Sequence, residues 1–99
     1  MRTDPLGPVH PGEVLREEFM AQLGLTAAAL GRATGLRASR IGDIANERGP
    51  VRADVAVRLA RVLNTSPEFW MNLQARHDLD IAEQRAAAAL QLLRPVAAE

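Results

Sequence analysis

The chain has 99 residues and a mass of 10.7 kDa, the size of one domain with a modest hydrophobic core. With 47% apolar and 24% charged residues, its composition is that of a globular protein. Because cysteine is absent, disulfide scaffolds, thiolate zinc sites and cysteine nucleophiles are excluded. No stretch approaches the roughly 18 consecutive apolar residues of a membrane span, so we expect a cytoplasmic protein.

The net charge of zero conceals a basic middle between acidic ends. Residues 26–61 hold seven arginines and three carboxylates, a net charge of +4. Residues 1–25 and 62–99 each carry a net charge of −2. This segregation predicts an anion site in the middle of the chain, while the neutral total argues against indiscriminate coating of nucleic acid.

The first predicted elements are an extended arm and a helix. Prolines break residues 1–10, which predicts an arm without regular structure. A helix over 11–23 is expected to begin with Pro11 at its first position and to end at Gly24, with His10 as its cap.

Two short helices follow, with a glycine turn between them. Thr26 is a typical N-cap for a helix over 27–34, which is expected to end at Gly35. A second short helix is expected over 38–46. Two helices joined by so short a turn predict a helix-turn-helix over about residues 26–46.

The remaining elements are two longer helices. A helix over 53–63 has apolar residues on one side and charges on the other. Ser66 and Pro67 form a strong start for a fifth helix, which is expected to bury Trp70 and to continue through the Ala-rich run 86–93. That run is either a hydrophobic seam for a second chain or a solvated tail.

Since no run alternates with a period of two, the predicted fold class is all-α. The predicted organisation is an arm over 1–10, a five-helix domain containing the helix-turn-helix over 11–84, and a helical extension over 85–99.

The helix-turn-helix interpretation depends on residues that hold the two short helices together. Leu30 and Ile41 are apolar where the helices must lock. Gly31 stands at their closest approach, and Gly35 occupies a turn that needs a positive φ. Thr34 is a poor fit, because an apolar residue is usual at that place.

The second helix of such a motif enters the DNA major groove, so its outward face holds the candidate contacts. Serine, arginine and asparagine side chains there can hydrogen-bond base edges or phosphates, and a glycine lets the helix lie close to the groove. Flanking arginines are candidate phosphate ligands. The candidate DNA-binding residues are Arg37, Ser39, Arg40, Gly42, Asp43, Asn46, Arg48 and Arg52.

Asp43 is an awkward neighbour for phosphates. It either accepts from a cytosine amino group or pairs with Arg40 three residues earlier, and we favour the pair.

Catalytic and metal sites are not expected. His10 and His77 are the only histidines, and without cysteine they make no plausible metal site. The sequence contains no nucleophile–base constellation and no phosphate-binding glycine loop, so we expect no enzyme and no cofactor.

Three strings in order resemble one known family. The string HPGEVLREEF (10–19) is similar to the "HPGEILREEF" opening of HigA-type antitoxins, a branch of the XRE helix-turn-helix family. ADVAVRLAR (53–61) resembles the family's "ADTALRLAR", and TSPEFWMNLQ (65–74) resembles "TSPEFWLNLQ". Together they cover about residues 10–84.

The resemblance implies a λ-repressor-like fold and a homodimer that represses its own operon at a palindromic operator. It also implies a partner toxin of the HigB type, a ribosome-dependent mRNA endonuclease related to RelE. Three residues depart from the family pattern. Ala27 replaces a phosphate-contacting glutamine, Arg52 replaces a helix-capping threonine, and Glu47 replaces a small or basic residue.

Two alternatives stay open. One is a stand-alone XRE regulator without a toxin. The other is a protein-interaction module that no longer binds DNA, which Ala27, Asp43 and Glu47 favour.

Overall fold

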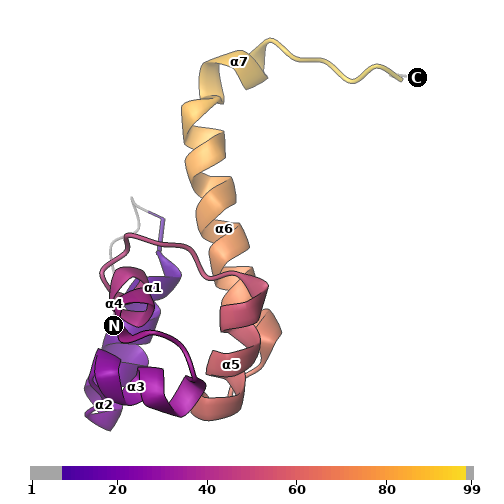
Figure 1. Ribbon diagram of the computed structural model, residues 1–99. Helices are drawn as coiled ribbons and strands as arrows, with labels where there is room; N and C mark the ends of the chain where they lie inside the picture. The colour runs from indigo at the N-terminus through magenta and orange to yellow at the C-terminus, as the bar shows by residue number, and fades with distance from the viewer. Residues whose placement is uncertain (1–7, 98–99) are drawn as a thin grey trace.

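The computed structural model describes residues 8–97, and over that range every regular element is a helix (Figure 1). Of the predicted arm, residues 1–7 lie outside the described residues, and residues 8–10 are not helical. The elements are α1 (Pro11–Val14), the π-helical segment η1 (Leu15–Met20), α2 (Ala21–Leu23), α3 (Ala27–Thr34), α4 (Ala38–Ala45), α5 (Ala53–Leu63), α6 (Pro67–Arg85) and α7 (Ala87–Gln91).

The first three elements run on without a break and together fill the predicted helix over 11–23. Pro11 opens the helix, and the imidazole Nδ1 of His10 accepts from the Gly12 N–H at 2.8 Å, which confirms the predicted cap. Gly24 ends the helix with a φ of 66°. The π-helical middle was not predicted.

The helix-turn-helix elements have the expected bounds, except that α4 ends at Ala45, one residue early. The hydroxyl of Thr26 accepts from the Ala29 N–H at 3.0 Å, so it is the N-cap of α3. Gly35 follows α3 with a φ of 78°, as predicted for the turn. Ser66 caps α6 in the same way through the Phe69 N–H.

The hydrophobic core lies between the first helix, the helix-turn-helix and the pair α5–α6. Trp70 is fully buried at its centre, as predicted, and its indole N–H donates to the Thr65 hydroxyl at 2.8 Å. The rings of Phe19 and Phe69 lie 5.3 and 5.0 Å from that of Trp70. Burial of these rings and of the aliphatic residues around them is the main stabilising contribution.

Helix α6 rises away from the body of the domain and carries α7 at its tip (Figure 1). The expectation that this helix continues through residue 93 was wrong. Ala86 takes φ −98° and ψ 6°, α7 ends at Gln91, and no glycine or proline marks the break. Over residues 8–97, no helix is long and apolar enough to cross a lipid bilayer.

Candidate nucleic-acid interface

The helices of the helix-turn-helix pack as closely as the sequence predicts. Leu30 and Ile41 are fully buried between them. A Cβ atom at Gly31 would lie 2.8 Å from the carbonyl oxygen of Leu36, so only glycine fits there without displacement of the backbone. The position of α4 on α3 is therefore fixed by contact with the backbone itself.

Thr34 is accommodated by hydrogen bonds rather than by apolar packing. Its buried hydroxyl donates to the Leu30 carbonyl at 2.7 Å. Its own carbonyl accepts from the Arg58 guanidinium at 2.7 Å, which ties the turn to α5. The threonine predicted to be a poor fit thus has a structural role: its hydroxyl bonds within α3, and its carbonyl bonds to α5.

The eight candidate DNA-binding residues form one surface on and around α4. Six of them are exposed, and Arg40 and Gly42 are partly exposed. A Cβ atom at Gly42 would meet nothing within 4 Å, so packing within the protein does not require glycine there. That Gly42 serves an approach from outside stays a prediction.

The arginines of this surface do not pair as predicted. Arg40 donates two hydrogen bonds to Asp54, at 2.8 and 3.2 Å, and Asp43 accepts from Arg48 at 3.3 Å. The favoured Asp43–Arg40 pair was therefore wrong. Arg40 reaches the first turn of α5, whereas Arg48 lies in the turn that folds back over α4. Hydrogen bonding from Arg40 lowers the pKa of Asp54 below its usual range.

Arg37 and Arg52 lie immediately before the first residues of α4 and α5. They are the N-cap residues of α4 and α5, and neither side chain caps its helix. Over residues 8–97, neither makes an ion pair. Helix N-termini attract anions, so two exposed guanidinium groups at these places suit phosphate oxygens. For Arg52 the missing side-chain cap is as expected from the replacement of a threonine by an arginine.

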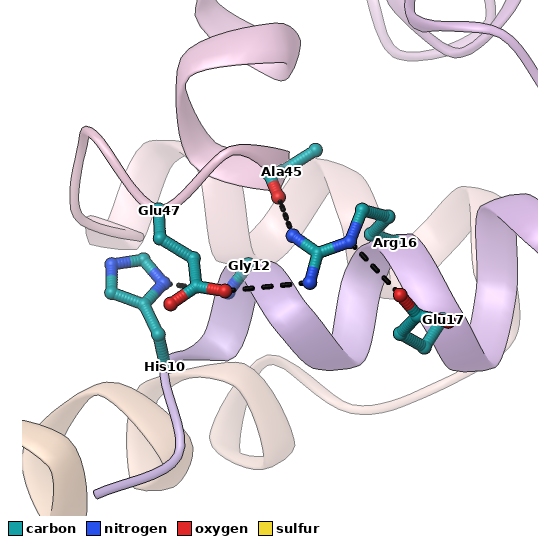
Figure 2. Close-up of polar contacts among 6 residues, drawn as sticks. All are labelled: His10, Gly12, Arg16, Glu17, Ala45 and Glu47. Carbon is teal, nitrogen blue, oxygen red and sulfur yellow. Dashed lines mark hydrogen bonds and ion pairs between the residues drawn. The ribbon is translucent and has the colours of Figure 1, made fainter. Parts of the chain in front are cut away.

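The far end of α4 rests on the first helix, a contact that was not predicted. The Arg16 guanidinium donates to the Ala45 carbonyl and pairs with Glu47 at 3.4 Å and with Glu17 at 3.0 Å (Figure 2). Gly12 leaves room for the Ile44 carbonyl, which a Cβ atom there would strike. Gly12 and Arg16 lie in the HPGEVLREEF string that carries the family resemblance, but that string alone does not predict which residues they contact.

No group of three or more histidine or carboxylate side chains within the described part of the chain could hold a metal ion. The arrangement is an exposed face of α4 with polar side chains and with cations at both ends of the helix, which suits the charge of a nucleic-acid groove.

Three comparisons relate the chain to known proteins. The family described as "Helix-turn-helix" matches residues 15–70. Antitoxin HigA-1 of Vibrio cholerae is 34% identical over 96 residues, which cover 97% of this chain and 90% of that protein.

Two similar solved structures contain regulatory DNA. The Pseudomonas aeruginosa antitoxin HigA with the higBA promoter has a TM-score of 0.85 and 39% identity, covering 90% of this chain and 98% of that one. The antitoxin GraA in complex with its operator has a TM-score of 0.86 and 43% identity, covering 99% of this chain and all of that one.

Proposed function

This chain belongs to the helix-turn-helix family, in its XRE-type branch of HigA antitoxins, which are non-enzymatic DNA-binding proteins, and from that premise we propose that it represses its own toxin–antitoxin operon. The observation that carries the proposal is the exposed face of α4 with arginines at both ends. The promoter and operator complexes of its structural neighbours support the same use of this fold.

In the proposed complex, α4 lies in the major groove. Ser39, Arg40 and Asn46 read base edges, Gly42 permits the close approach, and Asp43 faces the groove beside Arg48. The phosphate contacts are assigned to Arg37, Arg48 and Arg52, which position the helix and contribute no direct sequence information.

Fluorescence anisotropy with the DNA upstream of the gene tests repression. We expect tighter binding than to scrambled DNA, with a steep decrease as salt rises. Arg40→Ala should weaken operator binding by about 1–3 kcal/mol and relax specificity. Arg52→Ala should weaken binding to both the upstream and the scrambled DNA, and it should reduce the salt slope by about 1. Arg76→Ala, on α6, is the control and should change neither.

The proposed protein partner is a toxin of the HigB type, an mRNA endonuclease, which the chain neutralises by binding. The name of the Vibrio cholerae relative supports an antitoxin role. Co-expression with the product of the neighbouring gene tests it: growth should be rescued and the two chains should co-purify. Operator binding without either result would indicate the stand-alone regulator.

A homodimer is proposed because two α4 helices must reach half-sites about 34 Å apart on a palindromic operator. Helix α6 offers a surface for it. Trp70, Leu73 and Ile81 face the body, while a second set of exposed residues at helical spacing points away from it: Met71, Ala75, Leu79 and Ala82. Leu79 is 50% exposed, and Leu90 and Leu93 of the extension are 46% and 64% exposed.

Light scattering after size exclusion tests the dimer. Leu79→Glu places a charge on the outward set and should yield monomers that retain native circular dichroism. Gln84→Glu introduces the same charge on the same helix outside that set, and it should remain dimeric. A dimer that survives Leu79→Glu would assign the interface elsewhere.

The interaction module is the second candidate, because Arg40 and Arg48 are already paired with carboxylates at the surface. If this pairing has replaced DNA contacts, the chain should bind its upstream DNA no more tightly than scrambled DNA. The anisotropy experiment therefore separates the two candidates.

A further inference from the structure

The C-terminal end of α4 leaves four carbonyl groups without partners inside the helix, as every α-helix does. Three are satisfied by the turn that follows: Gly42 accepts from Asn46 at 2.9 Å, Asp43 from Arg48 at 2.7 Å, and Ile44 from Glu47 at 2.9 Å. The last two bonds form a Schellman motif. The fourth carbonyl, that of Ala45, accepts from Arg16, which lies 29 residues earlier in the chain.

The backbone of the turn is strained at one residue that Arg16 also contacts. The Schellman motif requires a left-handed conformation at the residue after the cap, and this place is usually glycine. Here it is Glu47, with a φ of 64°. A non-glycine side chain is sterically unfavourable in this region, and the ion pair with Arg16 offsets part of that strain.

The place from which Arg16 acts is itself fixed. His10 caps the first helix, and Gly12 brings its backbone against the Ile44 carbonyl, so the helix and the end of α4 touch directly (Figure 2). Arg16 is one turn further along on the same side, with a side chain 37% exposed. The Asp43–Arg48 pair lies within α4 and its own turn, whereas Arg16 joins the end of α4 to the first helix.

From this geometry we infer that Arg16 is a positioning residue for DNA recognition. By bonding the Ala45 carbonyl and Glu47 together, it sets the direction in which α4 ends. It thereby sets where the side chain of Asn46 meets the base edges, while Arg48 is held by its own pair with Asp43. The guanidinium faces the protein and contacts no DNA itself. The inference rests on the proposed function, since it names how one part of the DNA-binding surface is held.

The test compares Arg16→Gln with Arg76→Gln. Both changes remove a surface arginine that pairs with two carboxylates, but Arg76 pairs with Asp80 and Glu83 on α6, away from α4. At a temperature where both variants are folded, Arg16→Gln should weaken binding to upstream DNA about tenfold, the equivalent of one weakened base-edge contact. Arg76→Gln should not.

The salt dependence separates positioning from direct contact. Because Arg16 neutralises no phosphate, Arg16→Gln should leave the salt slope and the affinity for scrambled DNA unchanged. A shallower slope, by about 1, would overturn the inference and make Arg16 a phosphate ligand. Unchanged operator affinity would overturn it as well. Arg16→Lys retains one donor for the Ala45 carbonyl and should restore part of the affinity.

Amide hydrogen exchange provides a measurement that needs no DNA. In Arg16→Gln, the amides of Asn46, Glu47 and Arg48 should exchange faster, while those inside α5 keep their protection. If the wild-type chain does not distinguish its upstream DNA, the proposed function fails, and exchange still decides whether Arg16 holds the end of α4. Unchanged exchange at these three amides would overturn the inference.

Discussion

The imidazole of His10 lies edge-on to that of His77, with ring centroids 4.8 Å apart and ring planes at 73°. The contact joins the start of the first helix to the middle of α6. The Nδ1 atom of His10 also accepts from the Gly12 N–H, which only the neutral imidazole can do. The cap on the first helix therefore depends on the protonation state of His10.

The first prediction concerns pH. Burial lowers the pKa of His10, and His77 and Arg16 lower it further, while Glu47 and Asp78 act in the opposite direction. Below about pH 6.5 the unfolded chain therefore binds a proton that the folded chain does not. The free energy of unfolding should fall as the pH drops through this value and level off below the folded pKa, as measured by denaturant titration from pH 7.5 to 5.

His10→Asn provides the control for this pH dependence. Asparagine can still cap the helix, but it does not titrate. The variant should remain folded and lose the part of the pH dependence that His10 contributes. An unchanged profile would mean that His10 does not cause the pH dependence.

The second prediction contrasts two glycines of the helix-turn-helix. At Gly31 a Cβ atom would press on the Leu36 carbonyl, so Gly31→Ala should destabilise the fold by about 1–3 kcal/mol. At Gly42 there is open space, so Gly42→Ala should stabilise α4 by up to about 1 kcal/mol. Thermal denaturation measures both changes. If Gly42 serves the approach to DNA, the stabilised variant should still bind upstream DNA more weakly.

The third prediction concerns Asp54, which holds Arg40 in a two-bond ion pair. Asp54→Asn removes a negative charge from the proposed DNA-binding surface and releases the guanidinium. Binding to scrambled DNA should become tighter, and the salt slope should steepen by about 0.9 if Arg40 gains one phosphate contact. Asp80→Asn, which removes the ion-pair partner of Arg76 on α6, should leave both unchanged.

The fourth prediction concerns Glu47. Glu47→Gly removes a side chain from a left-handed backbone position, a relief of about 1 kcal/mol. It also removes an exposed ion pair with Arg16, which typically contributes at most about 1 kcal/mol. We expect a neutral to slightly stabilising effect in denaturant unfolding. A loss above about 1 kcal/mol would mean that the ion pair outweighs the strain.

The features that the sequence predicted well are local ones. Thr26, Ser66 and Gly35 mark helix boundaries through bonds or dihedral angles that involve only their chain neighbours, so their residue types carry the signal. Gly31 was equally readable, because a glycine inside a helix costs about 1 kcal/mol relative to alanine, which favours a close approach as its reason.

The features that it missed depend on tertiary geometry. Arg40 had carboxylates available on its own helix and on the next, and only the tertiary placement of the start of α5 selects Asp54. Arg16 and Ala45 lie 29 residues apart, and a backbone carbonyl has no signature in the sequence. The break at Ala86 is likewise unmarked, because Ala86 and the three alanines that follow it have the strongest helix propensity.

The π-helical segment η1 (Leu15–Met20) gives the first helix a wider turn than an α-helix has. Gly12, before the segment, and Arg16, in its first half, face the end of α4, whereas Phe19, in its second half, packs beside Trp70. Each residue added to or removed from a helix rotates what lies beyond it by about 100°. The segment therefore sets the angular register between two unrelated contacts. Deletion of Glu18 alone, which lies between Arg16 and Phe19, would turn one contact away from its partner while leaving every residue of both intact.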